Sequence, residues 1–382
     1  MKNLELYVHI PFCIKKCAYC DFLSFSSDER TQFAYVDALI REIKFYGPKM
    51  QDYFVTTIFV GGGTPTALHE DKMVEILDAI YTNFRVSSDA EITMECNPGT
   101  VTITKLEKYR KAGVNRLSIG LQSADDGELQ ILGRIHTYRK FVETFGMARR
   151  AGFSNINVDL MSGIPYQTAE KFLQTLQKVV NLKPDHISAY SLIVEEGTPF
   201  YEAYKSDLVL QEAGKMTKAL PTEDEVYRIT KLTQQYLAQA GYVQYEISNF
   251  AHPGCECVHN VGYWTRENYL GLGLGAASLL NNVRYTNTSD MTTYLEGELR
   301  VEECPVSRKE QMEEFMFLGL RMLRGVTRQQ FQDTFGIPID AIYRDVMEQL
   351  KAEGLLELYA GRIALTEKGQ ELSNYALAQF LL

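Results

Sequence analysis

The first 250 residues alternate short apolar runs with longer segments in which apolar residues recur at helical spacing. The short runs are rich in Ile and Val or end at Gly, Asn or Pro, as buried strands do. The longer segments carry charged residues on the opposite face, which is typical of helices packed on one side. We therefore predict strands at residues 4–10, 56–60, 91–95, 116–120, 155–160 and 186–192, and helices at 31–45, 72–84, 104–112, 138–151 and 169–181.

Strand–helix alternation of this length indicates right-handed βαβ units and a parallel sheet. Six units are too few for a closed eight-fold barrel, so we expect an α/β fold whose core is an open, partial (β/α)6 barrel. In such sheets, catalytic and binding residues gather at the C-terminal ends of the strands. The residues that follow each predicted strand are therefore the first candidates for a site.

The remainder of the chain is patterned differently. Residues 202–222 are charged and weakly patterned, which predicts a loop or linker, and residues 249–290 are predicted to form a loop rich in Gly, Asn and aromatic residues. A helix at 223–240 and a strand at 244–247 lie between these segments. In the C-terminal region we predict helices at 308–323, 328–335 and 339–353, a hairpin of strands 355–358 and 362–365, and a last helix.

These patterns predict three parts: a partial barrel at 1–250, a loop-rich extension at 251–306 and a small winged-helix-like domain at 307–382. The last part carries more acidic than basic residues, which disfavours DNA binding and favours packing against the barrel or a protein or ligand contact.

Charge and cysteine usage narrow the class of protein. The chain of 382 residues has a net charge of −10, which disfavours broad capture of nucleic acid, so no nucleic-acid partner is expected. Its seven cysteines are an odd number with three bunched together, which is no disulfide framework and indicates a reducing compartment. We find no signal-peptide pattern, and the longest near-apolar run, 269–280, is too short to span a bilayer. These observations predict a cytoplasmic protein.

Three cysteines follow the first predicted strand at once: Cys13, Cys17 and Cys20, in the spacing C-x3-C-x2-C. Three thiolates can hold an iron–sulfur cube and leave its fourth iron open for another ligand. The alternatives are a zinc site or incidental cysteines. Zinc usually takes two spaced pairs, or one pair with histidines, and no second pair lies nearby.

Polar groups and glycines follow other predicted strands. The run Gly61-Gly62-Gly63-Thr64-Pro65 lets the backbone approach a polar cofactor group, although it could also be a tight turn. Glu95, Gln122 and Asp159 could each cap a helix or hold a loop, but together they form a ring of hydrogen-bonding groups suited to a nucleoside-type ligand. Arg134 could neutralise a carboxylate through a bidentate pair.

These residues resemble the radical S-adenosylmethionine (SAM) superfamily. The stretch Tyr7-Val-His-Ile-Pro-Phe-Cys13 is similar to relatives of the oxygen-independent coproporphyrinogen III oxidase, and the resemblance covers nearly the whole chain. It implies that the three cysteines hold a [4Fe–4S] cluster whose open iron is chelated by SAM. It also implies a SAM site lined by Tyr7, Tyr19, Gly62, Gly63, Thr64, Glu95, Gln122, Arg134 and Asp159, with Glu95 facing the ribose.

Two departures from the oxidase point to the heme-chaperone branch of that family. Phe22 stands where the oxidase has a further cysteine, and the N-terminal arm that closes the oxidase site is absent before Cys13. A third feature agrees, because His259-Asn-Val-Gly-Tyr263-Trp264 matches the HNxxYW motif of that branch.

The HNxxYW segment also has chemistry of its own. An imidazole is a good axial ligand for heme iron, and aromatic neighbours offer flat apolar surface to a macrocycle, so His259 is the heme candidate. Cys255 and Cys257 leave thiolate ligation or a small metal site open. The alternative is that His259 is a hydrogen-bonded loop residue within an aromatic core.

Three functions remain in competition. The first is a heme chaperone that binds a [4Fe–4S] cluster, SAM and heme, and transfers heme to acceptor proteins, membrane-associated ones among them. The second is a radical SAM enzyme of the oxidase type, and the third is an iron–sulfur redox sensor with a winged-helix output. The oligomeric state, the acceptor, covalent heme attachment, SAM cleavage and any part for Cys255 and Cys257 are left open by the sequence.

Overall fold

The computed structural model describes residues 2–382, except for the side chains of residues 301 and 302. Each predicted strand of the barrel is present within a few residues of its expected bounds. Neighbours in chain order pair in parallel, which confirms the predicted partial barrel of an α/β fold. The strands are β1 (Lys2–Ile10), β2 (Tyr53–Gly62), β3 (Val86–Cys96), β4 (Arg116–Gln122), β5 (Asn155–Ser162) and β6 (His186–Ser191).

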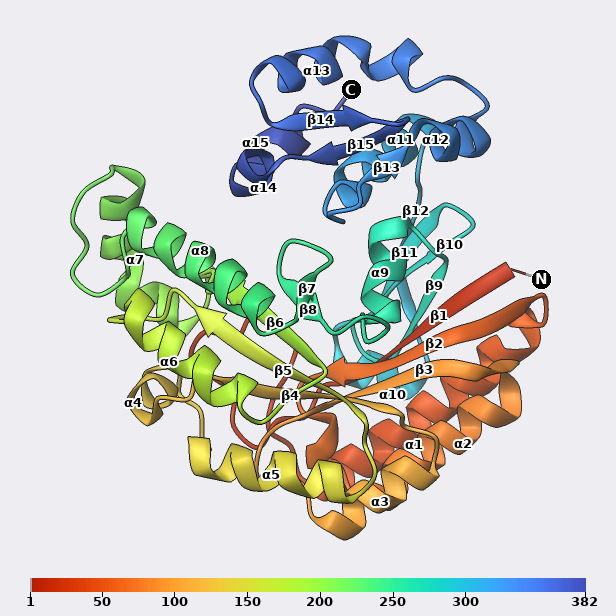
Figure 1. The fold of residues 1–382 in the computed structure, drawn as a ribbon. Coiled ribbons are helices and arrows are strands. Elements are labelled where there is room, and N and C mark those ends of the chain that lie inside the picture. The colour runs from red at the N-terminus through yellow and green to blue at the C-terminus, as the bar shows by residue number, and fades with distance from the viewer. Residues whose placement is uncertain (1) are drawn as a thin grey trace.

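The predicted helices between these strands are also present, and they line the outer side of the sheet in Figure 1. A short helix, α4 (Asp126–Ile131), and two 3-10 turns, η1 (Gly47–Met50) and η2 (Pro65–Ala67), were not predicted because they are too short to show a period. Within residues 2–382, no helix has the length and apolar character needed to cross a bilayer. The matching helices are α1 (Glu29–Tyr46), α2 (Glu70–Asn83), α3 (Ile103–Lys111), α5 (Tyr138–Arg150), α6 (Ala169–Val180) and α8 (Glu223–Gln239).

The prediction of a loop at 202–222 was wrong for its first half, which belongs to helix α7 (Pro199–Glu212). Thr198 caps this helix and Pro199 occupies its first turn. Only Phe200 and Asp207 of the helix are buried, so no apolar stripe marks it in the sequence. Asp207 accepts the backbone N–H groups of residues 218–220 and thereby orders the segment that follows.

The predicted strand 244–247 and loop 249–290 were also wrong. Two short strands stand in place of the first, and a helix and three strands replace most of the loop. The strands are too short to show a clear period, and two of their pairings are with distant parts of the chain: β9 pairs in parallel with β1, and β8 pairs antiparallel with β6. The elements are β7 (Val243–Gln244), β8 (Asn249–Ala251), α9 (Val258–Thr265), β9 (Tyr269–Leu272), β10 (Ala277–Leu280), β11 (Val283–Asn287), α10 (Met291–Glu296) and β12 (Arg300–Pro305).

These additions give one twelve-stranded sheet in the order β12-β11-β10-β9-β1-β2-β3-β4-β5-β6-β8-β7. Strand β1, which is the first strand of the chain, therefore lies inside the sheet, with β2 on one side and β9 on the other. The division of the chain at 250 and 306 stays a prediction.

The C-terminal region forms a second, three-stranded sheet with its own helices and core, seen at the top of Figure 1. The predicted hairpin is present, and Ala360 and Gly361 at its turn both have positive φ angles, of 49° and 78°. The first predicted helix ends at Gly319 instead of residue 323, and the last helix is two short ones. The elements are α11 (Arg308–Gly319), β13 (Val326–Thr327), α12 (Arg328–Phe335), α13 (Asp340–Ala352), β14 (Leu356–Tyr359), β15 (Arg362–Leu365), α14 (Glu367–Glu371) and α15 (Ser373–Ala378).

Helix α9 carries the HNxxYW segment and is docked against the inner side of the sheet. The carboxylate of Glu91 on β3 accepts the backbone N–H groups of Val258 and His259, at 3.0 and 3.3 Å, and so caps the start of the helix. Gly262 faces Glu5 of β1 so closely that a Cβ atom would overlap the Glu5 carboxyl group. A glycine at position 262 is therefore what lets α9 reach β1.

We expect Gly262→Ala to lower the free energy of unfolding by about 1–3 kcal/mol, because the added methyl group forces α9 away from Glu5. Urea unfolding monitored by circular dichroism measures this loss. The matched control is Gly146→Ala in α5, where a Cβ meets only the end of the Arg150 side chain at 3.4 Å. That control should gain roughly 0.5–1 kcal/mol from helix propensity. Equal stability of the two variants would contradict the close docking of α9.

Candidate functional site

The loop after β1 places the side chains of Cys13, Cys17 and Cys20 on the wall of one cavity of about 280 Å³. The Cys13 N–H donates to the carbonyl of Phe25 at 3.0 Å, and that of Cys20 donates to the Cys17 carbonyl at 3.3 Å. Across residues 2–382, no three His, Cys, Asp or Glu side chains already stand in an arrangement that holds a metal ion. The cysteines thus share a cavity and a loop, and their role as cluster ligands stays a prediction.

Two polar groups from other loops contact the thiols: Thr64 follows β2, and Arg134 lies between α4 and α5. The Thr64 hydroxyl lies 3.5 Å from Cys13 Sγ, and the Arg134 guanidinium lies 3.6 Å from Cys17 Sγ. A guanidinium and a hydroxyl so placed can donate hydrogen bonds to the sulfur ligands of a bound cluster. The donor set of the cavity therefore fits an iron–sulfur cluster.

The glycine run packs directly on the cysteine loop. The Gly63 N–H donates to the Ile10 carbonyl at 2.8 Å, and the Thr64 N–H donates to the Phe12 carbonyl at 2.7 Å. A Cβ on Gly63 would lie 2.7 Å from the Phe12 carbonyl oxygen, and Gly62 has a φ of +110°. Structural need alone therefore accounts for glycine at both positions, while both also line the cavity.

Glu95 and Asp159 meet in the same cavity at the C-terminal ends of β3 and β5. The Gly62 N–H donates to Glu95 Oε2 at 3.0 Å, and Asp159 accepts from the Ser118 hydroxyl at 2.9 Å. Burial and the nearby Asp159 raise the pKa of Glu95 to about 8, and burial also raises the pKa of Asp159. Glu95 therefore favours its protonated form at neutral pH, and the pKa of Asp159 is shifted in the same direction.

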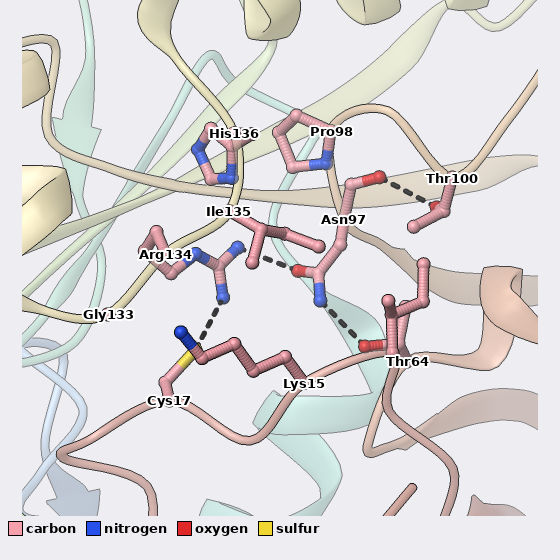
Figure 2. A pocket seen from close by; sticks show the side chains of 11 residues that line it. Lys15, Cys17, Thr64, Asn97, Pro98, Thr100, Gly133, Arg134, Ile135 and His136 are labelled. Carbon is pink, nitrogen blue, oxygen red and sulfur yellow. Dashed lines mark hydrogen bonds between the residues drawn. The ribbon is translucent and has the colours of Figure 1, made fainter. Parts of the chain in front are cut away.

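Arg134 and Asn97 connect loops at the edge of the cavity. Figure 2 shows both residues in a smaller neighbouring pocket that shares Cys17, Thr64, Asn97 and Arg134 with the cavity. Arg134 Nη2 donates to Asn97 Oδ1 at 2.8 Å and to the Gly120 carbonyl at 2.6 Å, and Asn97 Nδ2 donates to the Thr64 hydroxyl at 2.7 Å. Arg134 also keeps a buried Nε without a partner among the described residues. Sequence reasoning missed Asn97, although it lies two residues after Glu95 at the end of the same strand.

Gln122 and Tyr19 complete the group that the cavity brings together. Gln122 has a φ of 71°, and its Oε1 accepts from the Tyr190 hydroxyl at 2.9 Å. Tyr190 was missed by the sequence analysis, and only its place near the end of β6 could have marked it. The Tyr19 ring packs edge-on to Phe200 with ring centroids 6.3 Å apart.

Tyr7 is the one predicted SAM-site residue that does not line this cavity. It lines a second cavity of about 540 Å³, and Phe22 is on the wall of both. The Tyr7 hydroxyl lies 3.0 Å from Nδ1 of His9, whose Nε2 lies 2.9 Å from the Leu23 carbonyl. Tyr7 and His9 therefore brace the end of the cysteine loop.

His259 is buried, with 1% of its surface exposed, and both of its ring nitrogens have partners. Nδ1 lies 2.7 Å from the Thr57 hydroxyl and Nε2 lies 3.0 Å from the Tyr263 hydroxyl. Burial, reinforced by the charge of Arg116, lowers the pKa of His259 to about 3, so the ring is neutral. Its assignment to heme stays a prediction, and in this arrangement a ring nitrogen reaches iron only by giving up one of these bonds.

The two cysteines before the motif differ. Cys257 is fully buried, and its thiol lies 3.5 Å from Glu91 Oε1. Burial raises the pKa of Cys257 to about 12, so it remains a thiol, while Cys255 is partly exposed. Cys257 is thus accounted for by packing and by its contact with the Glu91 cap.

Comparisons with known proteins agree with this geometry. Residues 7–179 match the radical SAM superfamily, and residues 306–372 match the HemN C-terminal domain. The chain is 35% identical to "Heme chaperone HemW" of Bacillus subtilis (strain 168) over 98% of both chains, and 35% identical to the protein of that name from Escherichia coli (strain K12) over 99% of this chain and 98% of the other.

The solved structure described as "Coproporphyrinogen III oxidase (HemN) from Escherichia coli is a Radical SAM enzyme" is similar throughout. It has a TM-score of 0.85 and 25% identity, and the match covers all of this chain and 90% of that one.

The raised pKa of Glu95 predicts a difference in pH dependence. Because the folded-state pKa of about 8 exceeds the ordinary value of 4.5, the unfolded chain binds fewer protons, and the free energy of unfolding falls as the pH rises from about 4.5 to 8. Glu95→Gln carries no proton to lose, so its stability relative to the parent protein should rise between pH 5 and pH 8. Urea midpoints of the ligand-free proteins at the two pH values measure this. Exposed Glu195→Gln is the control, and a parallel response of Glu95→Gln and the parent would contradict the assignment.

Proposed function

The chain belongs to the HemW family of radical SAM proteins, and from this premise we propose that it is a heme chaperone that carries a [4Fe–4S] cluster, binds SAM and passes heme to acceptor proteins. The observation that carries the proposal is the 35% identity to chains named heme chaperones over 98% of both lengths. The cavity at the strand ends supports it, because it gathers thiols, carboxylates and a guanidinium in the places that such ligands need.

We propose Cys13, Cys17 and Cys20 as the cluster ligands. Arg134 and Thr64 lie 3.6 and 3.5 Å from the sulfur atoms of Cys17 and Cys13 and can donate hydrogen bonds to them. When bound, the cluster and SAM supply the reductive radical chemistry that gives the superfamily its name. The protein's own part is to hold the thiols on a loop that is tied to β2 and β4.

We propose that SAM lies against the strand ends between the cluster loop and β5. Glu95, whose pKa of about 8 favours the protonated form at neutral pH, can both donate and accept hydrogen bonds with hydroxyl and amino groups. Asp159 offers further carboxyl oxygens in the same cavity. Arg134 supplies a cation for the carboxylate of the ligand. The full set proposed is Tyr7, Tyr19, Gly62, Gly63, Thr64, Glu95, Gln122, Arg134 and Asp159, of which all but Tyr7 line the cavity.

We propose that heme is bound by the HNxxYW segment, with His259 as part of its site, and that it leaves to heme-accepting proteins, membrane-associated ones among them. Cys13, Cys17, Cys20, Cys96, Cys255 and Cys257 are free thiols, as in proteins of the reducing cytoplasm. A cytoplasmic location therefore forms part of the proposal.

A radical enzyme of the coproporphyrinogen III oxidase type is the second candidate. The similarity to the Escherichia coli oxidase over the whole chain, at a TM-score of 0.85, favours it. Phe22 argues against it, because the oxidase family has a further cysteine at that position. Anaerobic incubation with reductant, SAM and coproporphyrinogen III decides between them: turnover with release of 5′-deoxyadenosine would establish the oxidase and overturn the chaperone.

We expect Cys13→Ser, Cys17→Ser and Cys20→Ser each to lose the cluster, because a hydroxyl does not replace a thiolate as an iron ligand. Iron and sulfide analysis and the visible absorption of anaerobically reconstituted protein measure the loss. Cys304→Ser, at an exposed position on β12, is the matched control and should retain a full cluster. A cluster that survives all three substitutions would overturn the ligand assignment.

We expect the parent protein to bind one ferric heme per chain and His259→Ala to bind it at least tenfold more weakly, since the substitution removes the partner of Tyr263. Titration followed in the heme absorption band, with transfer to apomyoglobin as a stand-in acceptor, measures both binding and release. The titration is done with and without the reconstituted cluster. A parent protein that binds no heme would overturn the proposed function.

A further inference from the structure

The second cavity lies where helix α9 meets β1, the cysteine loop and the C-terminal domain. Its volume of about 540 Å³ is within the range of roughly 300–1,000 Å³ typical of small-molecule sites. Aromatic rings from four separate elements form much of its wall. They are Tyr7 on β1, Phe22 on the cysteine loop, Tyr263 and Trp264 on α9, and Tyr269 on β9. A planar, apolar ligand is what such a wall accommodates.

Two arginines give the same cavity a positive charge. Arg266 and Arg284 both line it, and both contact one carboxylate, that of Glu314 on α11, at 2.7 and 3.0 Å. Two guanidinium groups and one carboxylate together carry one net positive charge. A planar ligand that also carries carboxylates, as heme carries its propionates, therefore complements both the rings and the charge of the cavity.

The HNxxYW segment presents its tyrosine, and not its histidine, to this cavity. His259 and Tyr263 lie one turn apart on α9, and their rings are in edge-to-face contact with centroids 4.8 Å apart. Tyr263 is on the cavity wall, whereas the His259 ring lies behind it, stacked on Phe59 at 5.2 Å. Its Nε2 is 3.0 Å from the Tyr263 hydroxyl.

We propose that this cavity holds the heme, with Tyr263 as the axial ligand of the ferric iron and His259 as the residue that positions the Tyr263 hydroxyl. The inference rests on the proposed function and adds the place and the ligand. Tyrosine is an established type of heme ligand. Direct ligation by His259 would instead cost a buried hydrogen bond to Thr57 or Tyr263, and leave that partner unpaired.

Coordination of ferric iron by Tyr263 requires the loss of one proton and no electron transfer. The bond between Tyr263 Oη and iron forms as the O–H bond breaks, and the proton leaves to water in the open cavity that Tyr263 lines. His259 stays neutral: its Nε2–H donates to the coordinated oxygen, and its Nδ1 accepts from the Thr57 hydroxyl. Iron remains ferric throughout.

Resonance Raman and electron paramagnetic resonance spectra of the full chain, with its cluster reconstituted anaerobically and ferric heme added, test the inference. The parent protein should show the vibrations of an iron-bound phenolate and high-spin ferric iron. Tyr263→Phe should lose those vibrations and bind heme at least tenfold more weakly. His259→Ala should keep the phenolate vibrations at shifted frequency, which a direct histidine ligand would not do.

The control is Tyr242→Phe, which removes a tyrosine hydroxyl beside another histidine, His252, whose ring centroid lies 4.2 Å away and outside the cavity. It should leave the heme spectrum unchanged. Near-ultraviolet circular dichroism checks the fold of each variant, and the spectrum of the parent protein identifies the ligand without any substitution. An imidazole-type spectrum in the parent that persists in Tyr263→Phe overturns the inference while heme binding stands. Failure of the parent to bind heme overturns the proposed function and the inference together.

Discussion

Parallel pairing of β1 with β2 on one side and β9 on the other is the constraint on which both cavities depend. Strand periodicity then divides the side chains of β1 between two environments. Leu4, Leu6, Val8 and Ile10 are fully buried in the main core, so a slip of one residue would bury Glu5, Tyr7 and His9 there instead. The fixed register holds the cysteine loop at one end of the strand and brings Glu5 against α9 near the other.

The barrel and its strand-end residues were predictable because their signals are local. Glu95, Gln122 and Asp159 each end a strand whose apolar run is visible in the sequence, and the structure brings all three to one cavity. The strands β9 to β12 were not predictable, since they are short and pair with one another or with β1. Asn97 and Tyr190 were missed for a different reason: their importance lies in bonds to Arg134 and Gln122, which only the folded chain creates.

The HNxxYW segment shows why a motif does not assign roles to its own members. In the sequence, the histidine is the obvious metal ligand of the segment. In the structure, Glu91 caps the helix, and Thr57 and Tyr263 contact the two nitrogens of His259. Burial, reinforced by the charge of Arg116, keeps the ring neutral. The side chains of the segment that line the cavity are those of Tyr263 and Trp264. A buried polar residue that is fully hydrogen-bonded orients its neighbours more readily than it binds a ligand, because every new bond requires an old one to break.

The contacts of the C-terminal domain at the same cavity indicate its role better than its winged-helix-like shape does. Leu318 of α11 lines the cavity, Glu314 bridges Arg266 and Arg284, and Arg321 stacks on Trp264 with 4.3 Å between the guanidinium carbon and the ring centroid. Each of these contacts joins the domain to the segment between α9 and β11. A domain with more acidic than basic residues has no electrostatic reason to bind DNA. One of its acidic residues, Glu314, instead pairs with both arginines of this cavity, and Leu318 contributes to the cavity wall.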